Sequence, residues 1–536
     1  MHFTREHRGT EFVSDKISGG MFLFLAVLSL VTPVLVLTIL DRVKPALKYR
    51  WLGVLGGVIT AFIFILLWQL NIPARISLSV WQVGLLPQVQ PAMLLDSVSW
   101  SYSLSLVSLV AAIILTTGIR QETASRSWVF TLLLTTLGIL AVSASDPLTL
   151  ILMWTAMDVF VLGFMVFLNP GRELGRPMIT SFSFRLLGTG IFLLAGIMGA
   201  DAFLPVGFER ISSGPTLLAI LAAALRLGIF PLGLLFPEES STRRGMFTAF
   251  RLVFPTTGFA FLARLPGFGL SNAPELLAFC ILVILAFWAG WKWVKSSNEI
   301  AGRPYWIAGI FTLVTLSSFV AEPALSPGLG VMLVLSGAFL FLLSSQEKNI
   351  LWSAGVCLWG LTAMPFSPAA GIWILRDGFS WLLLLVILPS QALLVSGFIH
   401  HLGRPGDRLP VSRERWHQIP YVIGIVFLCL IIILLGLWGW VGAARLGTWW
   451  ASIIVVGLAV LFLLLGSRIK VKPQSGFFLR QERATRLVMN KVGETTVAWV
   501  EKALHAISST LEGEGGIIWS ILILVLILSL LTLGGQ

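Results

Sequence analysis

Long apolar runs, separated by short polar or basic segments, recur along almost the whole chain. The first two cover Met21–Leu40 and Trp51–Leu70, and the last covers Gly516–Leu533. About sixteen runs reach the ~20 residues that a helix needs to cross a bilayer. The pattern therefore predicts an all-α, multi-pass membrane protein of about sixteen transmembrane helices. A stretch before the third run, Ile76–Val80, is β-like and interrupts this pattern.

The spacing of polar segments divides the chain into five predicted parts. They are 1–97 with two spans and an outer loop, 98–400 as the membrane core, 401–466 with two further spans, 467–515 as an amphipathic segment, and 516–536 as the last span. Within the fourth part, apolar residues recur at three- and four-residue steps over Glu482–Leu511. This predicts either an amphipathic helix on the cytoplasmic membrane surface or, because Gly493 interrupts it, a short helical hairpin.

The charge distribution argues for a membrane orientation rather than for a nucleic-acid partner. The chain is 57% hydrophobic and 12% charged, with a net charge of +12. Lysines and arginines gather in every second loop, whereas loops such as Pro266–Pro274 contain none. This is the positive-inside pattern, which predicts basic loops in the cytoplasm and both termini outside. We expect a prokaryotic plasma membrane, and we expect the lipid bilayer rather than nucleic acid to be a partner.

Two apolar runs combine a charge with helix-breaking prolines. In the first, Arg226 precedes Pro231 by five residues. A charge at bilayer depth usually marks an ion or substrate path, and a broken membrane helix is tolerated where its backbone lies inside protein or lines a wet cavity. These features predict a transporter-type core.

The second such run comes five spans later. It contains Pro365 and Pro368, followed by Arg376 and Asp377. Paired broken helices at corresponding positions indicate internal repeats. An odd offset of five spans predicts two inverted five-helix units.

Candidate cofactor ligands are sparse. Cys280, Cys357 and Cys429 lie within apolar runs without metal-ligand spacing, and every histidine falls outside the predicted spans, His400 and His401 included. No glycine-rich phosphate loop is present. We therefore expect no cofactor, no metal and no redox centre on this chain.

Several motifs resemble those of a known family. Arg226, Phe230-Pro231 and Phe236-Pro237-Glu238 are similar to a seventh-helix pattern in which a lysine precedes Phe-Pro and Leu-Pro-Asp steps. Further similar stretches are Leu94–Ser99, Asp146–Trp154, Phe184–Gly188, Thr257–Arg264 and Pro365–Asp377. The chain thus resembles the antiporter-like membrane subunits of respiratory complex I (NADH:quinone oxidoreductase) and the related Mrp-type cation/proton antiporter subunits, as a divergent member. The resemblance implies other membrane subunits as partners, and protons or monovalent cations as the transported ions.

The chain departs from this family where the family transfers protons. The fifth-helix glutamate falls on Thr155, and Asp158, one turn further, is the carboxylate that can replace it. The sixth-helix aspartate falls near Thr189, the eighth-helix lysine on Thr256, and the eleventh-helix lysine around Gly337. Both broken helices carry arginine instead of lysine, and arginine does not release its proton in proteins.

The expected ion-pathway residues are Asp158, Arg226, Arg185, Arg251, Arg376 and Asp377. For Asp158, proton exchange and a structural pair with Arg226 both stay open. Arg185 is expected to pair with a carboxylate or backbone carbonyls, and Arg251 either contributes to the path or extends to the membrane surface. Arg376 and Asp377 form either a second ion site or part of the outer interface.

Three functions follow from these alternatives. The first is a membrane subunit of a proton- or cation-translocating complex, in which Asp158 exchanges protons, Arg226 biases it and Arg376 sets the field of the second half-channel. The second is a non-pumping structural subunit with fixed Asp/Arg ion pairs. The third is a stand-alone anion carrier that uses Arg226, Arg251 and Arg376.

Overall fold

A computed structural model provides the fold. It describes residues 8–43, 50–77, 91–117, 124–168, 176–198, 208, 213–229, 244–265, 270, 272–321, 323–343, 351–376, 381–403 and 418–468. The predicted amphipathic helix and the predicted last span lie outside these residues, as do Pro231 and Asp377.

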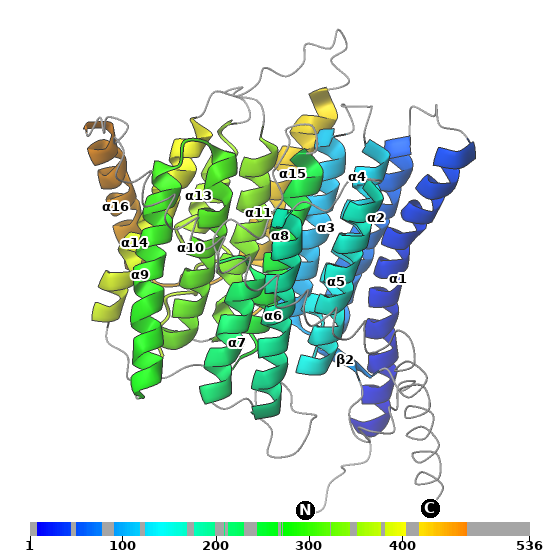
Figure 1. Cartoon of the computed structure of the whole chain (residues 1–536), viewed down its shortest axis with the longest axis horizontal. Coiled ribbons are helices and arrows are strands. Elements are labelled where there is room, and N and C mark those ends of the chain that lie inside the picture. The colour runs from blue at the N-terminus through cyan, green and yellow to red at the C-terminus, as the bar shows by residue number, and fades with distance from the viewer. Residues whose placement is uncertain are drawn as a thin grey trace, which may run out of the picture.

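The described chain is almost entirely helical, and its long helices stand side by side in one bundle (Figure 1). The helices are α1 (Arg8–Val43), α2 (Arg50–Trp68), α3 (Ser97–Thr117), α4 (Ala124–Val142), α5 (Pro147–Leu168), α6 (Arg176–Met198), α7 (Ser213–Arg226), α8 (Arg244–Leu262), α9 (Ala273–Lys295), α10 (Glu299–Val320), α11 (Pro327–Leu342), α13 (Ala354–Leu361), α14 (Leu382–Leu402), α15 (Gln418–Leu437) and α16 (Trp449–Arg468). Two short 3-10 turns, η1 (Gln69–Asn71) and η4 (Pro323–Leu325), accompany them.

Ten of the described helices are long and apolar enough to cross a membrane, and three shorter apolar helices accompany them. The prediction of an all-α multi-pass membrane protein is confirmed. The exact number of sixteen spans stays a prediction, because part of the chain lies outside the described residues.

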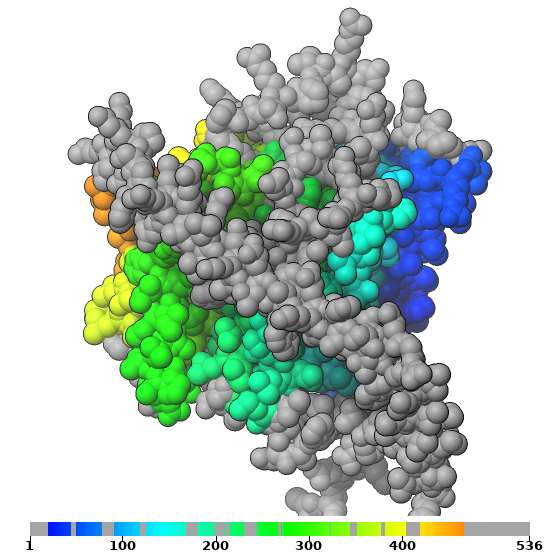
Figure 2. All heavy atoms as spheres, in the orientation of Figure 1, coloured from blue at the N-terminus to red at the C-terminus, as the bar shows by residue number. Residues whose placement is uncertain are grey.

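Burial separates central from peripheral helices. The spanning windows of α8 and α11 are 100% buried and that of α3 is 94% buried, against 28% for α2 and 33% for α9. The α3 helix packs against α2, α4, α8, α11 and α15. In Figures 1 and 2, α1 and α2 (blue) lie at one end of the bundle and α16 (orange) at the other. Because apolar side chains on α2 and α9 face outward, these helices offer a lipid-compatible surface.

The first predicted break follows directly after Arg226, where α7 ends. The backbone then turns at Gly228, whose φ is +73°, a left-handed conformation that glycine adopts at little cost. The helix therefore ends five residues before Pro231.

The second predicted break is observed after α13. The chain from residue 362 to 376 is irregular, and Pro365 and Pro368 lie within it. Gln391 of α14 compensates for part of the lost helix, because its amide donates to Leu361 O (2.7 Å) and accepts from the Trp373 indole (2.8 Å). Among the described residues, α8, α9, α10, α11 and α13 lie between the end of α7 and the second break, and the odd offset of five spans stays a prediction.

A small hairpin lies next to α1 and α3. Strand β1 (Ala74–Ser77) pairs antiparallel with β2 (Ala92–Leu95). The strand begins two residues before the predicted β-like stretch Ile76–Val80, whose last three residues lie outside the described chain.

The prediction that His400 and His401 lie outside the spans is wrong. His400 and His401 form the last turn of α14, and His401 is buried with its ring 4.1 Å from that of Trp293. The His401 ring is held there by hydrogen bonds with Ser296 Oγ (2.9 Å) and Trp293 O (3.0 Å).

Close contact between α3 and α11 generates a stability prediction. A Cβ atom at Gly330 would overlap the Tyr102 phenol. Gly330→Ala should therefore destabilise the bundle by about 1–3 kcal/mol, the usual cost of overpacking. Thermal unfolding in detergent, followed by tryptophan fluorescence, measures this. Gly163→Ala on α5, where a Cβ meets no atom within 4 Å, is the control and should not destabilise. Equal melting temperatures for both variants would contradict this packing.

Candidate ion-pathway site

Three helices bring a carboxylate and two guanidinium groups together inside the bundle. Arg226, the last residue of α7, donates from Nη1 to Asp158 Oδ2 on α5 (2.8 Å). Arg185, near the middle of α6, places Nε 3.4 Å from Asp158 Oδ1. All three side chains are at most 5% exposed. Asp158 is thus bracketed by two cations, and the trio carries one excess positive charge.

Arg226 is held by several further groups. Its Nη1 also donates to Thr189 Oγ1 and to Arg185 O (3.2 Å), and its Nη2 lies 3.4 Å from Trp154 O. The guanidinium also lies over the Trp154 ring, with 4.5 Å to the centroid. This many contacts fix the guanidinium in one place.

The structure adds Trp154 to the expected site. Its indole N–H donates to Thr257 Oγ1 on α8 (2.9 Å), and Thr257 in turn donates to Phe254 O (2.9 Å). Hydrogen bonds between uncharged groups therefore connect Trp154, and with it the Asp158 site, to α8. The signal in the sequence is its position four residues before Asp158, on the same face of the helix.

The predicted pairing of Arg185 with a carboxylate is observed, together with two aromatic contacts. Its Cζ atom lies 4.7 Å from the Phe254 ring centroid and 5.4 Å from that of Phe250. Rings of α8 thus cover this cation from the inner side of the bundle.

Arg251 does not extend to the membrane surface. It lies one helical turn before Pro255 in the fully buried α8, and only 5% of it is exposed. Of the two alternatives, the position inside the bundle is the one observed. Its part in an ion path stays a prediction.

The second broken helix places Arg376 at the end of α10 rather than beside a described carboxylate. Arg376 Nη2 donates to Phe319 O (2.7 Å), and its backbone N–H donates to Val320 O (3.0 Å). Leu375 forms a bridge with Ala321 next to it. Arg376 therefore binds a helix terminus, where a cation is favourable because of the helix dipole.

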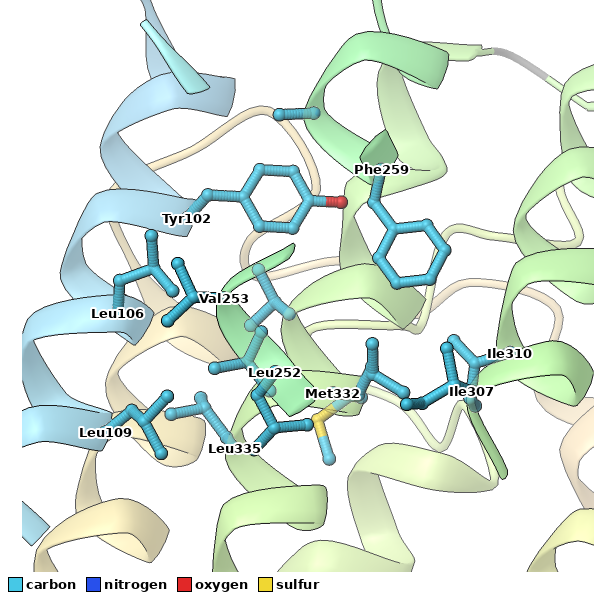
Figure 3. Close-up of a cluster of buried hydrophobic side chains, with 14 of the residues drawn as sticks. Tyr102, Leu106, Leu109, Leu252, Val253, Phe259, Ile307, Ile310, Met332 and Leu335 are labelled. Atoms are coloured by element: carbon cyan, nitrogen blue, oxygen red, sulfur yellow. The ribbon is translucent and has the colours of Figure 1, made fainter. Parts of the chain in front are cut away.

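Apolar side chains fill the space between α3, α8, α10 and α11, in the centre of the bundle (Figure 3). They include Leu106, Leu109, Leu252, Val253, Phe259, Ile307, Ile310, Met332 and Leu335, all buried. We call these nine residues the central apolar cluster. These nine side chains pack closely and offer no hydrogen-bonding groups of their own, while the Tyr102 phenol lies beside them (Figure 3).

Gly337 adjoins this cluster at the position where the resemblance places a lysine. A Cβ there would lie 3.1 Å from Leu252 Cδ2 and 3.3 Å from Trp306 Nε1. Gly337 therefore lets side chains of α8 and α10 approach α11 closely.

In the part of the chain that the structure describes, no three histidine, cysteine, aspartate or glutamate side chains lie close enough to hold a metal ion. The site consists of arginine, aspartate, threonine and tryptophan. Its chemistry is electrostatic.

Comparison with solved structures identifies the fold. A chain of the Mrp complex from Dietzia sp. DQ12-45-1b matches with a TM-score of 0.64 and 12% identity over 96% of this chain. A chain of the membrane-bound sulfane sulfur reductase, an archaeal respiratory membrane complex, matches with a TM-score of 0.58 and 14% identity, over 94% of this chain and 99% of that one. A chain of respiratory complex I from Thermus thermophilus matches with a TM-score of 0.53 and 16% identity, over 78% of this chain and 100% of that one.

These likenesses define the class of fold as that of the antiporter-like membrane subunits, so the predicted resemblance is confirmed for the fold. This chain spans 63% of the length of the Mrp chain that it matches. No family model and no curated protein sequence matches it.

The buried trio generates a thermodynamic prediction. Asp158→Asn leaves two buried guanidinium groups without a carboxylate and should destabilise the protein by about 3–5 kcal/mol. Combining it with Arg226→Gln should cost less than the sum of the two single variants, because both remove the same pair. Unfolding by titration with a denaturing detergent measures the three variants.

The matched control is Asp41→Asn, which removes a pair with Arg50 in which the Asp41 side chain is 36% exposed. Its cost should stay below about 1 kcal/mol. Additive effects at Asp158 and Arg226 would show that the two residues do not act as a pair.

Proposed function

We propose that this chain is a membrane subunit of a multi-subunit complex that moves protons or monovalent cations across a prokaryotic plasma membrane. The fold supports this, because three of the solved structures that it resembles are an Mrp complex, an archaeal respiratory membrane complex and respiratory complex I. The basic loops support an orientation with both termini outside. Such a chain has other membrane subunits as partners and needs no cofactor of its own.

Within this complex, we propose that Asp158 is a fixed counter-charge rather than a proton carrier. The observation that carries this role is the contact of its two oxygens with two different arginines, at 2.8 Å and 3.4 Å. These contacts hold the carboxylate in a buried ion pair, whereas a carrier must release its partners in each cycle. Arginine does not supply that proton.

The central apolar cluster supports the same role. Its nine side chains, on α3, α8, α10 and α11, are apolar and buried, and a proton path through them would need water or polar side chains. The fold of a translocating subunit is thus retained, while the groups that titrate are replaced by fixed charges and by close packing.

A second candidate, in which Asp158 exchanges a proton with internal water, is favoured by one detail. Asp158 Oδ1 accepts no hydrogen bond, since its ion pair with Arg185 is 3.4 Å long. The second candidate places the proton exchange at this oxygen. Arg226 then biases the proton exchange at Asp158, and Arg376 sets the electrostatic field of the second half-channel.

The anion-carrier alternative has less support from the geometry. Arg226 binds Asp158, whereas Arg376 binds the carbonyl of Phe319. The two arginines share no partner among the described residues, so they do not build one anion site.

Affinity purification of the tagged chain in mild detergent tests the membership. We expect other membrane subunits of an Mrp-like or respiratory complex to be recovered in stoichiometric amounts, because such subunits pack through long lateral helix faces. Mass spectrometry identifies them. Recovery of the chain alone would contradict the proposed membership and favour a single-chain carrier.

Ion flux through the reconstituted complex tests the role of Asp158. Asp158→Asn, normalised to the amount of assembled complex, should leave flux within about tenfold of wild type, because a fixed charge is not a step of the transfer. Loss of a proton-transferring group usually costs about 100-fold or more. A loss of that size would establish the second candidate. Asp41→Asn is the control for general effects of a removed ion pair.

A further inference from the structure

The connection between α15 and α16, residues 438–448, lies against the second broken helix. Phe366 of the break donates its backbone N–H to Arg445 O in the connection (2.8 Å). A Cβ atom at Gly447 would overlap Ala370 O, so the two backbones are in direct contact there. We call residues 438–448 the lid, because they lie over the irregular chain of the break.

Two further contacts lie at the two ends of the lid. In the first turn of α16, Ser452 Oγ donates to Ala363 O (2.6 Å). In the last turn of α15, a Cβ atom at Gly436 would overlap Phe366 O. The break is therefore bound by the lid itself and by the helix ends on both sides of it. These contacts satisfy main-chain groups that a continuous helix would satisfy by itself.

The backbone on both sides of this junction is strained. In the described chain, three non-glycine residues have a positive φ, and all three lie here. Ala363 (+56°) and Phe366 (+60°) belong to the break, and Ala444 (+55°) belongs to the lid. Residues with a Cβ atom rarely adopt this conformation, and they keep it only where the surrounding structure holds them. The lid and the break therefore hold each other in a conformation that neither favours alone.

The lid stands between a buried polar group and the outside of the bundle. Ser367 lies between the contact points Phe366 and Ala370. It is 0% exposed, and its Oγ has no hydrogen-bond partner among the described residues. The lid itself faces outward, since Trp438 and Leu446 are 45% and 63% exposed. Exposed tryptophan is typical of the boundary between membrane and water. Displacing the lid would thus uncover Ser367 from that boundary.

We propose that the lid is a movable closure of the second broken helix, and that its displacement gives small molecules access to the break at Ser367. The contacts that hold it are hydrogen bonds and van der Waals contacts of uncharged groups, which separate at a lower cost than a buried ion pair. The strained backbone at Ala363, Phe366 and Ala444 relaxes on opening and lowers that cost further. This inference does not depend on the proposed function.

Reaction of an introduced cysteine with N-ethylmaleimide tests the proposal. The purified full-length chain carries Ser367→Cys, and the native Cys280, Cys357 and Cys429 are replaced by alanine. Ser297→Cys in the same background gives the rate of an accessible thiol, because Ser297 is exposed. We expect Ser367→Cys to react at least about tenfold more slowly than Ser297→Cys, since a buried group reacts only from the open state.

Gly447→Val is the variant that displaces the lid. Its side chain would meet Ala370 O, and the φ of +60° at Gly447 is unfavourable for a β-branched residue. The Ser367→Cys thiol should then react at least about tenfold faster, because the open state becomes more populated. The matched control is Gly457→Val on α16, where a Cβ atom meets nothing within 4 Å, and it should leave the rate unchanged. If Ser367→Cys reacts as fast as Ser297→Cys with the lid intact, or if Gly447→Val leaves its rate unchanged, the proposal is wrong.

A milder variant keeps the test valid if Gly447→Val does not fold. Ser452→Ala removes the hydrogen bond to Ala363 O, so the Ser367→Cys thiol should react about fivefold faster, as expected for the loss of one hydrogen bond. Its control is Ser396→Ala on α14, which removes a hydrogen bond to Ala459 O of α16 (3.2 Å) and leaves the lid contacts intact. Equal rates in the Ser452→Ala and Ser396→Ala backgrounds would overturn the proposal.

Discussion

The pair of Asp158 and Arg226 at the end of a broken helix is the constraint around which the first half of the bundle is built. Arg226 closes α7 inside the membrane region, and a guanidinium there needs acceptors. Asp158 on α5, Thr189 on α6 and the Trp154 carbonyl and ring provide them. Three helices are thereby tied to one cation, and the break in α7 becomes tolerable because the polar groups face protein rather than lipid.

At the second break, the described residues that take up the freed backbone groups include a neutral amide and an arginine bound to carbonyl oxygens. Gln391 of α14 satisfies the carbonyl of Leu361 where α13 ends, and Arg376 binds the carbonyl end of α10. A neutral amide costs much less to bury than a charge. The two halves share the broken-helix architecture, but in the described chain the first break is stabilised by charge and the second largely by hydrogen bonds.

In the centre of the bundle, apolar side chains of α3, α8, α10 and α11 pack closely together. Gly337 lets Leu252 and Trp306 approach α11, and the central apolar cluster fills the adjoining space. A fold shared with subunits of an Mrp complex and of respiratory complex I is thus compatible with an interior whose polar groups are confined to separate places. The fold alone does not decide the chemistry of such a subunit, because the chemistry depends on a few buried side chains.

The amino-acid sequence by itself determined the membrane class, the helical fold, the positions of both broken helices and the residues Asp158, Arg185 and Arg226. The length of hydrophobic runs and the presence of a charge within such a run are local properties, and they can be recognised in the sequence alone. Only the tertiary structure decided that Arg226 reaches Asp158, that Trp154 connects the site to α8, that Arg251 is buried and that His401 belongs to α14. Those outcomes depend on which helix faces meet. Helices that are distant in sequence, such as α5 and α7, meet through tertiary packing, and a local sequence pattern does not predict that packing.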